Sequence, residues 1–68
     1  MNEKERLKKL LVHWLEHNNE HAATYREWAQ KMAEEGDEEL SLLLMKLGDE
    51  VSMLNAIFEE AITKTGKG

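Results

Sequence analysis

Apolar residues in this 68-residue chain form two long series, separated by one glycine–aspartate pair, and these series limit what the chain can fold into. Each series returns to the same side of a helix every three or four residues, which is the spacing of an amphipathic helix packed against one neighbour. Trp14, Tyr25 and Trp28 share this spacing, so we expect them in the core rather than in a ligand-binding cage. The first series comprises Leu7, Leu10, Leu11, Trp14, His17, Asn18, His21, Tyr25, Trp28, Ala29 and Met32, and the second comprises Leu40, Leu43, Leu44, Leu47, Val51, Leu54, Ile57, Phe58, Ala61 and Ile62.

The pair Gly36-Asp37 marks the boundary between the two predicted helices. Glycine can take the left-handed conformation that ends a helix, and aspartate can cap the helix that follows. Asn2 is a suitable cap for the first helix, with Glu5 three residues further on. The sequence therefore predicts helices over about 3–34 and 38–63, a turn over 35–37, and fraying of residues 63–68.

Two helices joined by a tight turn make one all-α domain over residues 1–68, an antiparallel hairpin about 45 Å long. A chain this short, without cysteine, buries little surface alone. Leu42, Met45 and Met53 lie off the main apolar series and would leave an exposed apolar patch on a monomer. We therefore expect two hairpins to associate as a homodimeric four-helix bundle. A monomeric hairpin, or one docked on a different protein, is the alternative.

Three polar residues, His17, Asn18 and His21, interrupt the middle of the first apolar series. Burying polar groups costs free energy unless each group finds a partner. The sequence thus predicts either a metal ion or a network of hydrogen bonds at this level of the hairpin.

A metal site is the first interpretation of these residues. His13, His17 and His21 follow one another at four-residue intervals, which places imidazoles of adjacent turns on one side of a helix. Glu20 lies at the flank, and an antiparallel partner helix brings Glu50 level with His21. Histidine and carboxylate ligands suit nickel, cobalt or zinc. The candidate ligands are therefore His13, His17, Glu20, His21 and Glu50.

A structural polar layer without metal is the alternative interpretation. A hydrogen bond between His21 and Glu50 would satisfy both groups, and buried polar residues can fix the register of helical bundles. Asn18 fits this account best. As a buried amide it should be replaceable by leucine with a gain in stability, since the exchange trades a polar group for apolar packing.

Charge and hydropathy narrow the range of partners. The chain has a net charge of −5, and affinity for nucleic acid depends on neutralising phosphates, so we expect no nucleic-acid partner. No apolar run approaches the ~20 residues of a membrane span. The charged N-terminus leads to no signal-peptide core, so we expect a soluble, cytoplasmic protein without a membrane partner.

The sequence gives little support to an enzyme. Residues 17–21, His-Asn-Asn-Glu-His, match the His-x-x-Glu-His pattern of inverzincin peptidases. A peptidase needs a third ligand from a distant segment, a substrate cleft and a much larger fold. The chain also lacks a serine or cysteine nucleophile constellation and a glycine-rich phosphate loop, so we expect no enzymatic activity.

The segment from His13 to Ala29 resembles a small, uncharacterised prokaryotic helical domain with an HW-x-EHN-x-EH core followed by an aromatic-x-x-Trp-Ala element. That family is associated with nickel- and cobalt-handling proteins. The resemblance implies metal buffering or delivery, with a metalloprotein or a metal-transport protein as partner. A structural or adaptor hairpin remains the alternative. The matching residues are His13, Trp14, His17, Asn18, Glu20, His21, Tyr25 and Trp28.

Overall fold

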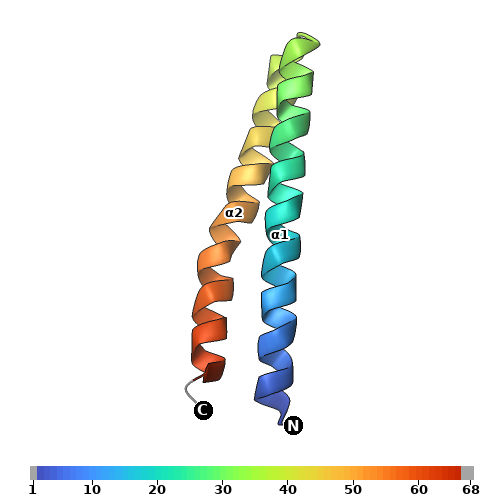
Figure 1. The fold of residues 1–68 in the computed structure, drawn as a ribbon. Helices are drawn as coiled ribbons and strands as arrows, with labels where there is room; N and C mark the ends of the chain where they lie inside the picture. The colour runs from blue at the N-terminus through green and yellow to red at the C-terminus, as the bar shows by residue number, and fades with distance from the viewer. Residues whose placement is uncertain (1, 67–68) are drawn as a thin grey trace.

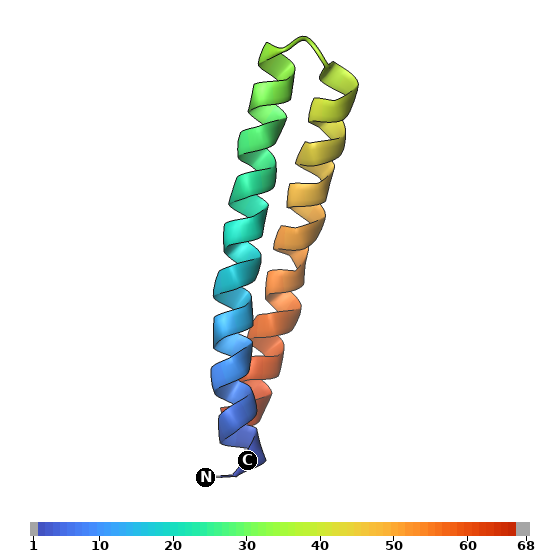
Figure 2. The ribbon, with the colours of Figure 1, turned by 90° about the vertical axis from the view of Figure 1, so that its right-hand side faces the viewer.

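The computed structural model describes residues 2–66 and consists of two long antiparallel helices, α1 (Glu3–Glu34) and α2 (Glu38–Gly66). The helices lie side by side along their length, with both ends of the chain at one end of the rod (Figures 1 and 2). The Cα atoms extend over 52 × 15 × 10 Å. The predicted all-α hairpin is confirmed, and α1 runs without a break through Asn18 and Asn19.

The helix ends carry the caps that the sequence predicts. Asn2 accepts a hydrogen bond from the backbone N–H of Glu5 through its side chain, at 2.9 Å. Gly36 has φ of +88°, which lets the N–H of Asp37 return to the carbonyl of Met32 at 2.9 Å. The Asp37 carboxylate then accepts from the N–H of Leu40 at 3.1 Å and begins α2.

Helix α2 continues further than its sequence predicts. Residues 63–66, expected to fray, are helical, and the Thr65 hydroxyl donates to the Ile62 carbonyl at 2.6 Å. Lys67 and Gly68, also expected to fray, lie outside the described residues. None of the helical segments within residues 2–66 has the length and apolar content needed to cross a membrane.

One row of residues from each helix forms the interhelical seam. The rows repeat at steps of three and four, which is the 3.5-residue period of a coiled coil. Only part of each predicted apolar series belongs to the seam, so the hairpin interface is narrower than the sequence pattern suggests. The seam comprises the buried and half-buried residues Leu11, Leu15, Asn18, Ala22, Tyr25, Ala29 and Met32 of α1, and Ser41, Leu44, Gly48, Val51, Asn55, Phe58, Ile62 and Thr65 of α2.

Small residues let the helices approach closely in the half of the hairpin nearest the turn. Ala22 and Ala29 are 2% and 1% exposed, and Gly48 is also buried. A Cβ atom at Gly48 would lie 3.1 Å from Cγ of Arg26 and 3.4 Å from the Ala22 carbonyl oxygen. The Ser41 hydroxyl donates across the seam to the Ala29 carbonyl at 2.7 Å.

Polar side chains join the helices at mid-length. The Asn18 amide donates to the Val51 carbonyl at 2.7 Å and to Oδ1 of Asn55 at 2.9 Å. Asn55 in turn donates to Oδ1 of Asn19 at 2.6 Å. Within residues 2–66, every fully buried side-chain nitrogen or oxygen has a hydrogen-bond partner. Asparagines, rather than histidines, therefore form the polar layer between α1 and α2.

Candidate functional site

A second row of residues on each helix is apolar but has no partner in the hairpin. These residues follow the same 3.5-residue period, with gaps between Trp14 and Trp28 and between Leu47 and Leu54, and most of them directly precede a seam residue. They are 40–64% exposed, although all are large and hydrophobic. We call this set the apolar face: Leu7, Leu10, Trp14 and Trp28 of α1, and Leu40, Leu43, Leu47, Leu54 and Ile57 of α2.

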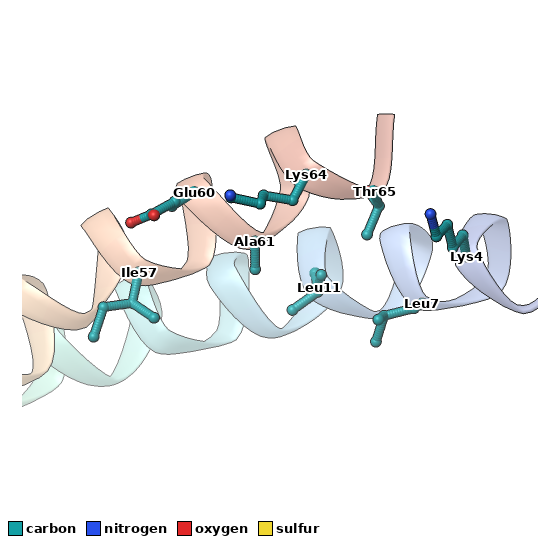
Figure 3. Close-up of a pocket in the computed structure, with 8 residues that line it drawn as sticks. All are labelled: Lys4, Leu7, Leu11, Ile57, Glu60, Ala61, Lys64 and Thr65. Atoms are coloured by element: carbon teal, nitrogen blue, oxygen red, sulfur yellow. The ribbon is translucent and has the colours of Figure 1, made fainter. Parts of the chain in front are cut away.

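Both rows of the apolar face lie on the same side of the hairpin. On each helix, the residue before a seam residue points about 100° away from the seam. Because the two helices are antiparallel, this rotation directs both rows to the same side of the hairpin. Leu7 from α1 and Ile57 and Ala61 from α2 line one open groove beside the seam residue Leu11 (Figure 3). Lys4, Glu60 and Lys64 lie around this groove.

The side of the hairpin opposite the apolar face is polar at mid-length. Nη2 of Arg26 donates to the Ser52 hydroxyl at 2.8 Å and lies 3.4 Å from both the Gly48 carbonyl and Oδ1 of Asp49. The Asn19–Asn55 hydrogen bond also lies on this side. At mid-length the hairpin thus has a polar side opposite the apolar face, and nearer its ends the exposed residues Val12, Leu42 and Met45 lie on that same side.

The surface area reflects the elongated shape of the hairpin. A compact monomer of this mass, 7.9 kDa, exposes about 4,400 Å². The chain exposes 5324 Å², because its Cα atoms extend over 52 × 15 × 10 Å.

The three histidines form a ladder of rings on α1. The His13 and His17 rings are stacked with centroids 5.7 Å apart, and the His17 and His21 rings meet edge-on at 5.1 Å. His21 also stacks on Tyr25 at 6.1 Å. His17 and His21 directly precede the seam residues Asn18 and Ala22, so they interrupt the apolar face at its centre.

The expected burial of the histidines is wrong for a single hairpin. His13, His17 and His21 are exposed, and no hydrogen bond joins His21 to Glu50 within residues 2–66. The apolar series read from the sequence combined two rows of residues: one row faces the other helix, and the second row faces solvent. Asn18 belongs to the first row and the two central histidines to the second.

The candidate ligands lie apart within residues 2–66 of one hairpin. Glu20 and Glu50 are exposed, and among residues 2–66 no group of three or more histidine, aspartate or glutamate side chains is placed to hold an ion. Among the three histidines, the rings of His17 and His21 lie closer together than those of His13 and His17. The assignment of His13, Glu20 and Glu50 as ligands stays a prediction.

The tryptophans are also placed differently from expectation. Trp14 and Trp28 are 45% and 48% exposed, and Nζ of Lys31 lies 4.4 Å from the centroid of the Trp28 ring. Tyr25 is half-buried in the seam, as its spacing predicts. The sequence did contain a sign of two separate rows on each helix, because apolar residues occur as adjacent pairs such as Leu10-Leu11 and Leu43-Leu44.

A family model described as a domain of unknown function (DUF8180) matches residues 7–65. The match covers both helices and the turn between them. No curated protein and no solved structure matches the chain.

Proposed function

The chain belongs to the family described as a domain of unknown function, DUF8180, and we propose that it is a helical-hairpin association module that dimerises through the apolar face. Two hairpins joined in this way form a four-helix bundle. The observation that carries the proposal is a second row of large apolar residues, with a coiled-coil period of its own, that one hairpin leaves open.

Adjacent helices of a bundle bury two neighbouring stripes, one against each neighbour. The interhelical seam and the apolar face lie about 100° apart on each helix, close to the right angle that a four-helix arrangement requires. Exposed Leu43 and Ile57 become core residues in such a bundle. Leu42 lies on the side opposite the apolar face and Met53 lies on the outer side of α2, so both stay in solvent, although their exposure, 69% and 68%, is the highest among the large hydrophobic residues.

A second copy is the partner that the charge distribution favours. Residues 27–46, around the turn, carry six carboxylates and two lysines. Residues 2–12 and 57–66, at the open end, carry five cations and four carboxylates. Two hairpins that point in opposite directions place each acidic turn beside the more basic end of the other copy. We therefore propose a two-fold dimer with the turns at opposite ends.

The test compares two adjacent leucines. Sedimentation equilibrium of the unmodified chain should give twice the 7.9 kDa mass at about 100 μM. Leu43→Lys should raise the dimer dissociation constant about 100-fold or more, since it buries a charge in the bundle core. Leu42→Lys adds the same charge on the side opposite the apolar face and should leave the dimer intact. A monomer for the unmodified chain, or equal effects of the two substitutions, would contradict the proposal.

Divalent-metal buffering or delivery is the second candidate function, and the 5.1 Å separation of the His17 and His21 rings favours it. Nickel, cobalt and zinc all accept imidazole ligands. The resemblance to nickel- and cobalt-handling proteins adds a metalloprotein or a metal transporter as the proposed partner. Calorimetric titration of untagged protein with each ion tests this function, and an absence of binding tighter than about 100 μM would remove it.

A further inference from the structure

We propose that one divalent transition-metal ion binds at the centre of the dimer, held by His17 and His21 of both copies. This inference rests on the proposed association, because each chain supplies only two of the four imidazoles. It differs from the metal site predicted from the sequence, in which all ligands come from one hairpin.

The spacing of the two rings is suited to a shared ion. Zinc–imidazole bonds are about 2.0–2.1 Å long, so two imidazoles on one tetrahedral ion have ring centroids roughly 5 Å apart. The His17 and His21 centroids are 5.1 Å apart, and both side chains are exposed. His13 lies nearer the outer side of α1, and its ring is stacked on His17 with centroids 5.7 Å apart, so we leave it out of the shared site.

The pair also lies at the midpoint of the apolar face. Trp14 and Trp28 are seven residues before and after His21, and Leu43 and Ile57 are seven residues before and after Glu50. Asn18 is bonded to Val51 and Asn55, so His21, three residues along α1, lies level with Glu50. A two-fold axis that crosses α1 midway between His17 and His21 places each apolar half of the face against the other half in the second copy.

This axis brings the histidine pairs of the two copies together. With turns at opposite ends, α1 packs against α1 of the second copy, at the 8–10 Å separation typical of packed helices. His17 and His21 from each copy then surround one point, which satisfies the four-coordinate geometry of zinc and of tetrahedral cobalt. Glu50 from each copy adds a carboxylate, the group that commonly accepts the second N–H of a metal-bound imidazole.

The inference predicts that the ion strengthens the dimer. A ligand that binds only the dimer shifts the association equilibrium in its favour. Sedimentation equilibrium of untagged full-length protein, in EDTA and then with Zn²⁺, Co²⁺ or Ni²⁺, should show the dissociation constant fall about tenfold or more. Titration should give one ion per two chains, and bound Co²⁺ should show the intense visible absorption of tetrahedral coordination.

Alanine substitutions along the histidine ladder provide matched controls. His17→Ala and His21→Ala should each remove the fall in the dissociation constant that the ion causes, measured against the same variant in EDTA. His13→Ala, an equally exposed histidine on the same helix, should preserve the effect.

The outcomes separate the two proposals. A dimer whose dissociation constant does not respond to any of the three ions overturns this inference and leaves the association module standing. One ion per chain on a monomer, or loss of the effect in His13→Ala as complete as in His17→Ala, also overturns it. A chain that stays monomeric with and without metal overturns both.

Discussion

The amide cluster between the helices gives the prediction with the most direct magnitude. Asn18→Leu removes two hydrogen bonds, to the Val51 carbonyl and to Oδ1 of Asn55. At ~0.5–1.5 kcal/mol each, their loss costs about 2 kcal/mol. Position 18 is half-buried, so the leucine side chain recovers about 1 kcal/mol through apolar burial. The net loss of about 1 kcal/mol should lower the melting temperature by about 5 °C.

A double-mutant cycle tests this reasoning. Asn55→Leu alone removes the bonds that Asn55 makes with Asn18 and Asn19, and should also destabilise the hairpin. The double variant Asn18→Leu/Asn55→Leu replaces both polar groups by apolar ones. Its loss of unfolding free energy should be about 1 kcal/mol smaller than the sum of the losses in the two single variants. Thermal unfolding is followed by circular dichroism at one fixed protein concentration, because dimerisation couples stability to concentration.

The result that would refute the reasoning is the one that the sequence alone suggests. If Asn18→Leu raises the melting temperature, the two hydrogen bonds contribute less than the burial of the leucine. If the two substitutions are additive, Asn18 and Asn55 do not act as a bonded pair. Asn19→Ala serves as control and should have the smallest effect, since Asn19 is exposed and accepts a single bond from Asn55.

Substitutions at three further positions test the turn, the close approach and the direction of the dimer. Gly36→Ala should lower the free energy of unfolding by about 1 kcal/mol, because φ at this position is +88°. An unchanged midpoint of chemical denaturation would contradict this. Gly48→Leu should unfold the hairpin or separate its helices, because the leucine side chain collides with Arg26 and Ala22. In Gly48→Ala only the flexible Arg26 side chain must shift, so the free energy of unfolding should stay within about 1 kcal/mol of that of the unmodified chain. Glu35→Cys should form no disulfide-linked dimer under mild oxidation, since antiparallel copies hold their turns at opposite ends; rapid cross-linking would favour parallel copies.

Local signals sufficed to predict the helices and their connection. Asn2, Gly36 and Asp37 act on backbone groups within a few residues of themselves, so their effects can be inferred without knowledge of the packing. The period of three and four predicted an amphipathic pair in the same way. The end of α2 was less predictable, because Thr63 to Gly66 carry no strong stop signal before the final residues.

The division of the apolar series into two rows could not be predicted from period alone. Both rows repeat every 3.5 residues, and both are apolar at most positions. What separates them is side-chain size: Ala22, Ala29 and Gly48 allow the helices to touch, whereas Trp14 and Trp28 would hold them apart. The exposure of His17 and His21 follows from this division and not from their own chemistry.

The tight turn at Gly36 also determines the order in which the hairpin can fold. The Ser41–Ala29 bond closes a loop of 12 residues, whereas the bonds from Asn18 to Val51 and Asn55 close loops of 33 and 37 residues. Closing the longer loops first would cost about 1 kcal/mol more in chain entropy. Helix pairing that begins at the turn and spreads toward the chain ends avoids this cost, because each new interhelical contact then closes a loop of only a few additional residues. We therefore expect the small-residue half of the hairpin to form early in folding and the open end, with Leu7 and Ile57, to exchange its amide hydrogens first.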